Sequence, residues 1–251
     1  MQLNLVQIDN AWENPQANFD NITALLERKP PAANSLVFLS EMFATGFTDN
    51  SSLGTAIEND VSAFLASIAR RWECYVSGGM VRGGKNCCVI FSPAGNLLHE
   101  YAKQKLFTLS GENRHYAAGH NCSVTDICGV KVATLVCYDL RFPELFRQAI
   151  RLGAEMFIVP ASWPESRQTH WRTLLQARAI ENQACVVGIS RIGCDPHTKH
   201  IGGSCIFDAE GRLILDAGGE QGVFSCEFDP QEIRQWRRKF PALSDSGLIG
   251  L

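Results

Sequence analysis

The sequence predicts a mixed α/β fold in which two mixed β-sheets pack against each other, with helices on the outer face of each sheet. Strand-like and helix-like segments alternate in both halves of the 251-residue chain. Hairpin patterns occupy the middle and the C-terminal part, and hairpins require antiparallel neighbours, which a plain doubly wound parallel sheet lacks. No repeat, low-complexity tract or linker interrupts the chain, so we expect residues 1–251 to form a single domain.

In the first half, apolar runs of strand length alternate with helical periodicity. The expected elements are a strand at 2–8, a helix at 15–28, a strand at 35–40, a helix at 61–72, and strands at 75–81, 86–92 and 97–102. The segment Arg82-Gly83-Gly84-Lys85 joins two of these strands, which indicates a β-hairpin. The segment Pro93-Ala94-Gly95-Asn96 is a tight turn before the last of them.

The second half continues the alternation. The expected elements are strands at 122–127, 131–136, 155–160, 184–190, 204–207, 213–215 and 223–228, and helices at about 142–152, at 167–182 and from 231 onward. Asp139 is expected to cap the first turn of the helix after 131–136, and Pro143 falls where its missing N–H removes no intrahelical bond. The segment Asp208-Ala209-Glu210-Gly211 predicts a second hairpin.

Composition excludes several classes of function. The net charge is −3 and only Arg237-Arg238-Lys239 forms a basic run, so no nucleic-acid footprint is visible. No charged leader opens the sequence and no apolar run approaches the length of a membrane span, which predicts a soluble cytoplasmic protein. The ten cysteines form no C-x-x-C pair and the six histidines show no zinc-binding spacing, so we expect core thiols and no metal.

Cys137 stands where a predicted buried strand meets a predicted helix. A thiol at such a corner lies near the positive end of the helix dipole, which favours the thiolate, and near unused backbone N–H groups. The thiolate can attack a carbonyl or a nitrile, and the N–H groups can receive the resulting oxyanion. Cys137 is therefore a candidate nucleophile; the alternative is a small core residue, because free cysteine is often buried.

Two charged residues, Glu41 and Lys103, also stand at predicted strand ends. Each has a structural alternative: Glu41 could be a helix cap or an ion-pair partner, and Lys103 a surface residue. Spacing alone does not distinguish Lys103 from Lys105, because residues two apart in an extended segment project to the same side.

Three local sequences resemble the nitrilase, or carbon–nitrogen hydrolase, superfamily, and the resemblance covers nearly the whole chain. They are Phe38-Leu39-Ser40-Glu41-Met42-Phe43, Tyr101-Ala102-Lys103-Gln104-Lys105-Leu106-Phe107 and Leu135-Val136-Cys137-Tyr138-Asp139-Leu140-Arg141-Phe142-Pro143-Glu144. The resemblance implies a four-layer α-β-β-α sandwich and a catalytic triad of Glu41, Lys103 and Cys137. It selects Lys103, although this chain has Ala102 where relatives often carry arginine and Lys105 where they often carry histidine.

The mechanism that the resemblance implies uses neither a metal nor an organic cofactor. Glu41 accepts the Cys137 proton, the thiolate attacks an amide carbonyl, ammonia leaves a thioester, and water activated by Glu41 releases the acid. Lys103 and the backbone N–H of Tyr138 would hold the oxyanion. Glu112 matches a further glutamate of the superfamily and would orient Lys103 or the substrate; its alternative is a solvated loop carboxylate.

Three further stretches resemble the bacterial ω-amidase branch of the superfamily. They are Ala161-Ser162-Trp163-Pro164, the run 170–183 and Ser190-Arg191-Ile192-Gly193. The branch implies hydrolysis of small amides such as 2-oxoglutaramate or 2-oxosuccinamate, whose substrates carry an α-keto acid carboxylate at the end away from the amide. Water is the second substrate in this reaction.

A carboxylate in that position favours an arginine as its partner. Arg141 is the first candidate and Arg191 the second; the alternative for Arg141 is a surface ion pair with Glu144. Phe43, Trp163 and Tyr138 are expected to wall the pocket, unless they serve only in packing.

Other functions stay open at this point. Within the superfamily the alternatives are an N-carbamoyl amidohydrolase, a deaminated-glutathione amidase or a true nitrilase. Outside it, the chain could be an inactive binding or scaffold protein with the same fold, or a thiol redox protein with a resolving partner for Cys137. The resemblance also implies a homodimer or larger homo-oligomer, to which the apolar C-terminal residues Leu243, Leu248, Ile249 and Leu251 could contribute.

Overall fold

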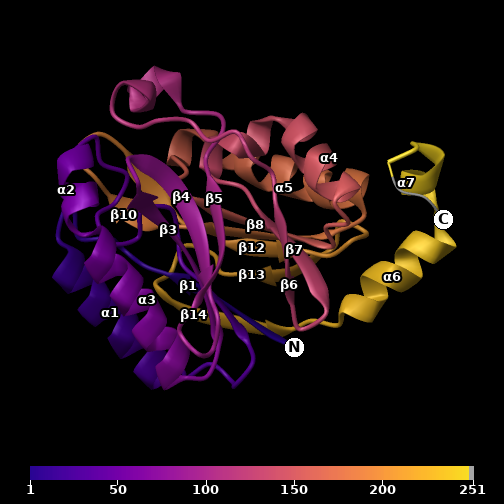
Figure 1. Cartoon of the computed structure of the whole chain (residues 1–251), viewed down its shortest axis with the longest axis horizontal. Helices are drawn as coiled ribbons and strands as arrows, with labels where there is room; N and C mark the ends of the chain where they lie inside the picture. The colour runs from indigo at the N-terminus through magenta and orange to yellow at the C-terminus, as the bar shows by residue number, and fades with distance from the viewer. Residues whose placement is uncertain (249–251) are drawn as a thin grey trace.

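Two six-stranded mixed β-sheets form the centre of the structure, a computed structural model that describes residues 1–248 (Figure 1). The first sheet contains β1 (Gln2–Gln7), β2 (Leu36–Phe38), β3 (Tyr75–Arg82), β4 (Lys85–Phe91), β5 (Leu97–Ala102) and β14 (Gly222–Glu227), in the order β14-β1-β2-β3-β4-β5. The second contains β6 (Val124–Ile127), β7 (Val130–Thr134), β8 (Met156–Ala161), β9 (Cys185–Ser190), β12 (Cys205–Phe207) and β13 (Leu213–Asp216), in the order β13-β12-β9-β8-β7-β6.

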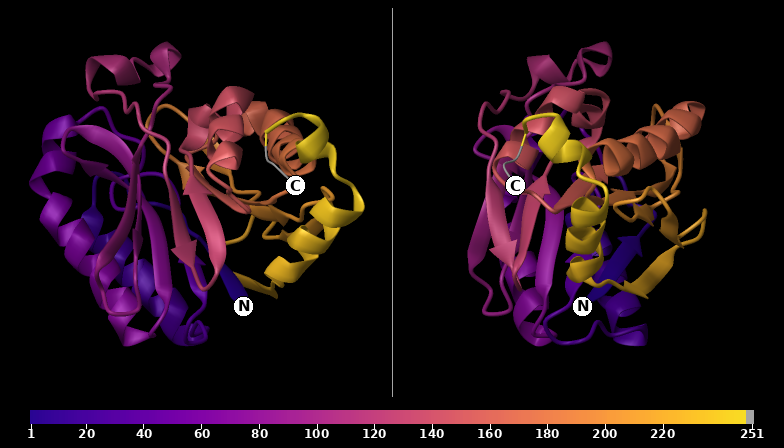
Figure 2. Two further views of the ribbon diagram at one scale, coloured as in Figure 1. Left: turned by 45° about the vertical axis from the view of Figure 1, so that its right-hand side comes forward. Right: turned by 90° about the vertical axis from the view of Figure 1, so that its right-hand side faces the viewer.

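Helices cover the outer face of each sheet, which gives four layers (Figure 2). The first sheet is covered by α1 (Pro15–Arg28), α2 (Ser51–Ala56) and α3 (Glu58–Arg71); the second by α4 (Pro143–Arg151) and α5 (Gln168–Asn182); α6 (Pro230–Lys239) and α7 (Ala242–Asp245) follow at the C-terminal end. Short 3₁₀ turns are η1 (Thr108–Ser110), η2 (Glu112–Arg114), η3 (Cys137–Arg141) and η4 (Glu165–Arg167), and β10 (Ile192–Cys194) pairs with β11 (Lys199–Ile201) as a small hairpin. The α-β-β-α sandwich is confirmed.

Three apolar clusters hold the layers together. Leu5 and Phe38 of the first sheet belong to the same buried cluster as Ile158 and Val187 of the second, so this cluster fills the space between the sheets. A second cluster joins α1 and α3 to the first sheet, and a third joins α4 and α5 to the second. Because side chains alternate along a strand, each strand can contribute to two clusters at once.

The expected elements are largely found, with short ones missed. The hairpin around Gly83 and Gly84 forms, and both glycines adopt positive φ, 53° and 70°. The elements that sequence patterns did not indicate are α2, α7, β10 and β11, all of them three to six residues long. Segments this short contain too few residues to establish a period.

The expectation that Asp139 caps the helix after β7 is wrong. That helix, α4, begins at Pro143 with Phe142 as its N-cap, and η3 occupies the segment between β7 and α4. Asp139 is fully buried, and its carboxylate accepts hydrogen bonds from the Val136 N–H (3.1 Å), the Lys105 N–H (2.8 Å) and the Tyr101 hydroxyl (2.9 Å). It therefore ties the turn that carries Cys137 to the segment that follows β5.

The C-terminal residues pack on their own chain. Leu243 is buried, and Leu248 packs against the same apolar cluster beside α4 and α5, so Leu243 is not free to contact a second subunit. Ile249 and Leu251 lie outside the described residues. Within residues 1–248, no helix combines the length and the apolar character needed to cross a membrane.

Candidate active site

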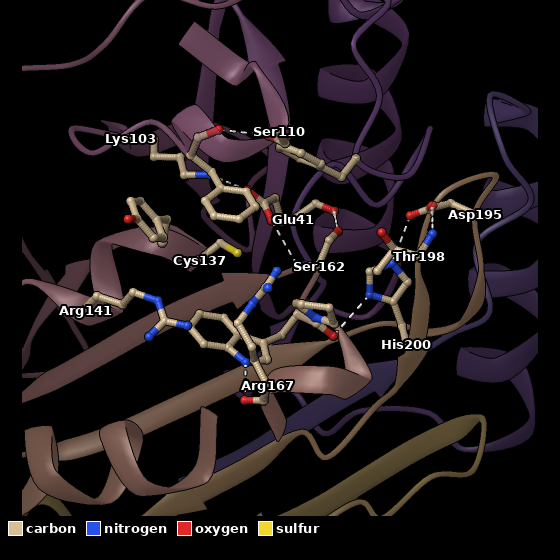
Figure 3. Close-up of a pocket in the computed structure, with 15 residues that line it drawn as sticks. Glu41, Lys103, Ser110, Cys137, Arg141, Ser162, Arg167, Asp195, Thr198 and His200 are labelled. Carbon is tan, nitrogen blue, oxygen red and sulfur yellow. Dashed lines mark hydrogen bonds and ion pairs between the residues drawn. The ribbon is translucent and has the colours of Figure 1, made fainter. Parts of the chain in front are cut away.

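Glu41, Lys103 and Cys137 meet at one open pocket (Figure 3). Glu41 follows β2 and Lys103 follows β5, both in the first sheet, whereas Cys137 follows β7 in the second. The pocket therefore lies where strand ends of the two sheets come together. Residues far apart in the sequence are brought together as the three motifs predicted.

The position of Glu41 depends on a close approach between β3 and the loop after β2. The Gly79 N–H donates to the carbonyl of Ser40 (3.1 Å), and the Phe43 N–H donates to the carbonyl of Gly79 (3.3 Å). A Cβ atom added at Gly79 would lie 2.5 Å from the Cα of Glu41. Glycine at position 79 therefore lets the backbone of Glu41 lie directly against β3.

Cys137 occupies an unusual backbone conformation at the first position of η3. Its φ is 46°, in the left-handed region that residues other than glycine rarely adopt. Such conformations cost about 1–3 kcal/mol and persist where the surrounding structure enforces them, often at active sites. The sharp turn presents the half-buried thiol to the pocket.

Lys103 is the centre of a buried polar network. Its Nζ lies 2.9 Å from Oε1 of Glu41 and 2.9 Å from Oε2 of Glu112. All three side chains are at most 1% exposed. Lys105, the open alternative, instead places its Nζ 5.3 Å from the centre of the Phe142 ring and is only half-buried.

Glu112 and Asn86 complete this network. Asn86 Nδ2 donates to Oε1 of Glu41 (2.7 Å) and to Oε1 of Glu112 (2.8 Å), and Asn86 is fully buried in β4. The Phe107 N–H donates to Oε2 of Glu112 (2.6 Å), and the Ser162 N–H donates to Oε2 of Glu41 (2.8 Å). The alternative of a solvated carboxylate at Glu112 is therefore wrong.

The charges of this network fix the state of Lys103. Burial alone would lower the pKa of its amino group, but the neighbouring charges of Glu41 and Glu112 raise the pKa above its ordinary value. Lys103 is therefore an ammonium ion throughout the neutral range and can stabilise negative charge that develops in the pocket.

The Cys137 thiol, unlike the Lys103 amino group, is held in its neutral form. Burial raises the pKa of the Cys137 thiol well above its ordinary value, and the charge of Glu41 raises it further, while the charge of Lys103 lowers it. The expectation that a helix dipole favours the thiolate is therefore wrong, since α4 begins only at Pro143. Cys137 is a thiol at rest and needs a base to become a nucleophile.

This state predicts how Cys137 reacts with an alkylating agent in the absence of substrate. Because its pKa lies well above 9, the thiolate fraction should rise about tenfold per pH unit from pH 6 to pH 9 without a plateau. Iodoacetamide labelling of the Cys137 peptide, followed by mass spectrometry, measures this rate, with exposed Cys194 as an internal reference. A plateau below pH 8 would contradict the raised pKa.

Only some of the residues that we expected to bind the substrate line the pocket. Arg141, Trp163 and Tyr138 line the pocket. Phe43 does not: it is fully buried and packs 6.0 Å from the Phe64 ring. Arg191 is also fully buried away from the pocket, with Nη2 donating to the carbonyl of Asn10 (3.2 Å). These two expectations are wrong, since both side chains serve the packing of the first sheet and its loops.

Several pocket residues were not identified from the sequence. The structure adds Phe47, Phe107, Ser110, Ser162, Pro164, Arg167, Asp195, Thr198 and His200 to the wall. Phe47 replaces Phe43, and its ring lies 5.3 Å from Nζ of Lys103. Arg167 follows the Trp163-Pro164 motif, so its place after a central parallel strand was a usable signal. Asp195 and His200 are brought to the pocket by the β10–β11 hairpin. Its strands are too short to show an alternating apolar pattern in the sequence.

Metal binding finds no support in the side chains that the structure describes. Within residues 1–248, no group of three or more histidine, cysteine, aspartate and glutamate side chains is arranged to hold a metal ion.

The fold and this cluster of cysteine, glutamate and lysine place the chain among the α-β-β-α sandwich enzymes. A family model described as carbon–nitrogen hydrolase matches residues 2–238, so the chain belongs to the carbon–nitrogen hydrolase family. It is an amidase, a hydrolase that acts on carbon–nitrogen bonds other than peptide bonds. The family match together with the amidase relatives favours an enzyme over the redox and scaffold alternatives.

Relatives with curated names align over nearly the whole chain. The omega-amidase YafV of Yersinia enterocolitica is 34% identical over 98% of this chain and 96% of its own. The 2-oxoglutaramate amidase of Bacillus subtilis is 32% identical over 97% of this chain and 96% of its own. A crystal structure of a CN-hydrolase superfamily protein from Xanthomonas campestris, with an arsenic adduct in its active site, is 28% identical and superposes with a TM-score of 0.90 over 98% of this chain and 96% of that chain.

Proposed function

We propose that Cys137 is the nucleophile of the amidase, Glu41 its general base and Lys103 the cation that stabilises the oxyanion. One observation carries this proposal: a buried ammonium group bridges two carboxylates beside a thiol held at positive φ in the pocket. Burial makes every charge in this cluster more effective than it would be in water.

The first half of the reaction forms a thioester. Glu41 takes the proton from the Cys137 thiol, and the thiolate attacks the amide carbonyl carbon. The oxyanion of the tetrahedral intermediate lies between Lys103 Nζ and the backbone N–H of Tyr138. The carbon–nitrogen bond then breaks, Glu41 returns the proton to the leaving nitrogen, and ammonia departs.

The second half hydrolyses the thioester. Glu41 takes a proton from a water molecule, whose oxygen attacks the thioester carbonyl. The second tetrahedral intermediate expels the Cys137 thiolate, which regains its proton from Glu41, and the acid product leaves. Glu112 and Asn86 act by holding Lys103 and Glu41 in position. Glu112 accepts a hydrogen bond from Lys103 Nζ, the Asn86 side chain donates to Glu41 and to Glu112, and neither residue lines the pocket.

The substrate that fits best is a small amide with a carboxylate at the far end, such as 2-oxoglutaramate. Relatives named omega-amidase and 2-oxoglutaramate amidase support this class. Arg141 supports it too: its guanidinium lies 5.0 Å from the centre of the Trp163 ring, and it forms no ion pair with a carboxylate within residues 1–248. The alternative pairing of Arg141 with Glu144 is therefore not formed among these residues.

Ammonia release from a panel of substrates tests this assignment. The panel contains 2-oxoglutaramate, 2-oxosuccinamate, an N-carbamoyl amino acid, deaminated glutathione and a nitrile of similar size. We expect the highest kcat/KM for 2-oxoglutaramate or 2-oxosuccinamate. A higher value for one of the other three would move the protein to the corresponding branch of the family.

We also propose that the chain works as a homodimer or larger homo-oligomer in the cytoplasm. All ten cysteines lie within residues 1–248 and each is free, which suits a reducing compartment. The exposed apolar side chains of Ile180 and Leu213, 52% and 45% accessible, are available to an interface. Sedimentation at micromolar concentration should show a dimer or larger species, and monomer alone would contradict this proposal.

A further inference from the structure

A second arginine, Arg167, points into the pocket beside Arg141. Arg167 ends η4, directly after β8 and the Trp163-Pro164 motif. Its carbonyl accepts a hydrogen bond from Nε1 of Trp163 (2.8 Å), which fixes its backbone against the pocket wall. Its guanidinium carbon lies 5.4 Å from the centre of the Phe107 ring, so the side chain is held over an aromatic surface.

Both guanidinium groups lack a carboxylate partner. Among residues 1–248, neither Arg141 nor Arg167 forms an ion pair, whereas most other half-buried arginines do. In the view of Figure 3, both arginines lie on one side of Cys137, with Glu41 and Lys103 on the other. An amide that reaches Cys137 with its carbonyl toward Lys103 therefore extends its other end toward two cations.

Asp195 is the acidic residue that also lines this part of the pocket, and its carboxylate is already engaged. Oδ1 accepts from the N–H groups of His197 (2.8 Å) and Thr198 (2.7 Å), and Oδ2 lies 2.9 Å from Nε2 of His200. Nδ1 of His200 faces the carbonyl of Trp163 (3.1 Å). Asp195 therefore serves the β10–β11 hairpin, and the free charge on this side of the pocket is positive.

Two guanidinium groups offer only hydrogen-bond donors and positive charge. The 2-oxo acid end of a substrate presents the matching pattern, because the carboxylate and the adjacent keto oxygen are all acceptors. The corresponding amino acid amide carries an ammonium group where the keto oxygen would be. That group adds a positive charge beside two guanidinium groups, which repel it and offer it no hydrogen-bond acceptor.

We propose that Arg167, acting with Arg141, is a specificity-determining residue that selects amides of 2-oxo acids and rejects the parent amino acid amides, glutamine and asparagine. This inference rests on the proposed function and adds the basis of its selectivity.

Kinetics of Arg167→Gln with three substrates test the inference. The substrates are 2-oxoglutaramate, glutamine and neutral butyramide; Arg151→Gln, an exposed arginine of α4 outside the pocket, is the matched control. We expect kcat/KM for 2-oxoglutaramate to fall about 10- to 100-fold, mainly through KM, because a charged hydrogen bond is lost. The loss for butyramide should be at least about tenfold smaller. The ratio of kcat/KM for 2-oxoglutaramate to kcat/KM for glutamine should fall by the same factor. Arg167→Lys should recover part of the lost ratio.

An equilibrium measurement separates recognition from catalysis. Binding of the product 2-oxoglutarate to Cys137→Ala and to the double variant Cys137→Ala/Arg167→Gln is measured by calorimetry, with about tenfold or greater weakening expected in the double variant. Unchanged binding and an unchanged substrate ratio in Arg167→Gln would overturn the role of Arg167 while leaving the amidase assignment intact. A wild-type protein that prefers butyramide would instead contradict the proposed substrate class.

Discussion

Replacing Cys137 by alanine is expected to abolish ammonia release from every amide that the wild-type protein cleaves. The variant keeps Lys103 and the rest of the pocket but lacks the sulfur that forms the thioester. Removing the nucleophile of a covalent hydrolase costs about 10⁴- to 10⁶-fold in kcat. A continuous ammonia assay with 2-oxoglutaramate measures the loss, and circular dichroism checks that the variant is folded.

A matched control uses another half-buried cysteine. Cys122 lies outside the pocket, and Cys122→Ala should retain hydrolysis within about twofold, since effects of substitutions away from a site are small. Equal activity of Cys137→Ala and the wild type would show that the covalent mechanism is wrong. Equal losses in both variants would indicate a general effect of cysteine removal.

Replacing Lys103 by methionine is expected to remove activity and to destabilise the fold. Methionine fills much of the same volume but leaves Glu41 and Glu112 buried without their shared cation. Removing one partner of a buried ion pair typically costs about 3–5 kcal/mol, because an uncompensated charge stays in a low-dielectric environment. Urea unfolding measures the change in free energy of unfolding, and the ammonia assay measures the loss of oxyanion stabilisation.

The control for this variant lies two residues away. Lys105 contacts the Phe142 ring at 5.3 Å and forms no ion pair within residues 1–248, so Lys105→Met should cost about 1 kcal/mol or less. This pair of variants also tests the choice between the two lysines that strand spacing alone left open. A larger loss of stability and activity in Lys105→Met than in Lys103→Met would reverse the assignment.

Long elements and the three motifs could be predicted from the sequence because their signals are local. The helix at 15–28 and the strand at 97–102 match α1 and β5 at both ends. Glu41, Lys103 and Cys137 could be placed at strand ends because each follows a segment that the sequence indicates as a strand. The resemblance to a family then implied the four-layer sandwich and the grouping of these three residues in one site.

Side-chain direction in loops could not be predicted in the same way. Phe43 and Phe47 stand in one loop without a period. The buried ring of Phe43 packs on β3 at Gly78, where an added Cβ atom would lie 3.0 Å from the ring, and this contact has no signal near residue 43 in the sequence. Arg191 was a plausible ligand by residue type, yet its guanidinium serves the carbonyl of Asn10. Asp139 was expected as a helix cap because the 3₁₀ turn η3 between Cys137 and α4 leaves no periodic signal.

The covalent intermediate on Cys137 is the most direct test of the account. Wild-type protein is mixed with saturating 2-oxoglutaramate, quenched in acid within the first turnovers, and examined intact and as peptides by mass spectrometry. We expect a mass increase equal to one acyl group, located on the peptide that contains Cys137 and absent from Cys137→Ala. Steady ammonia release without an adduct on any peptide, or with an adduct on another residue, would contradict it.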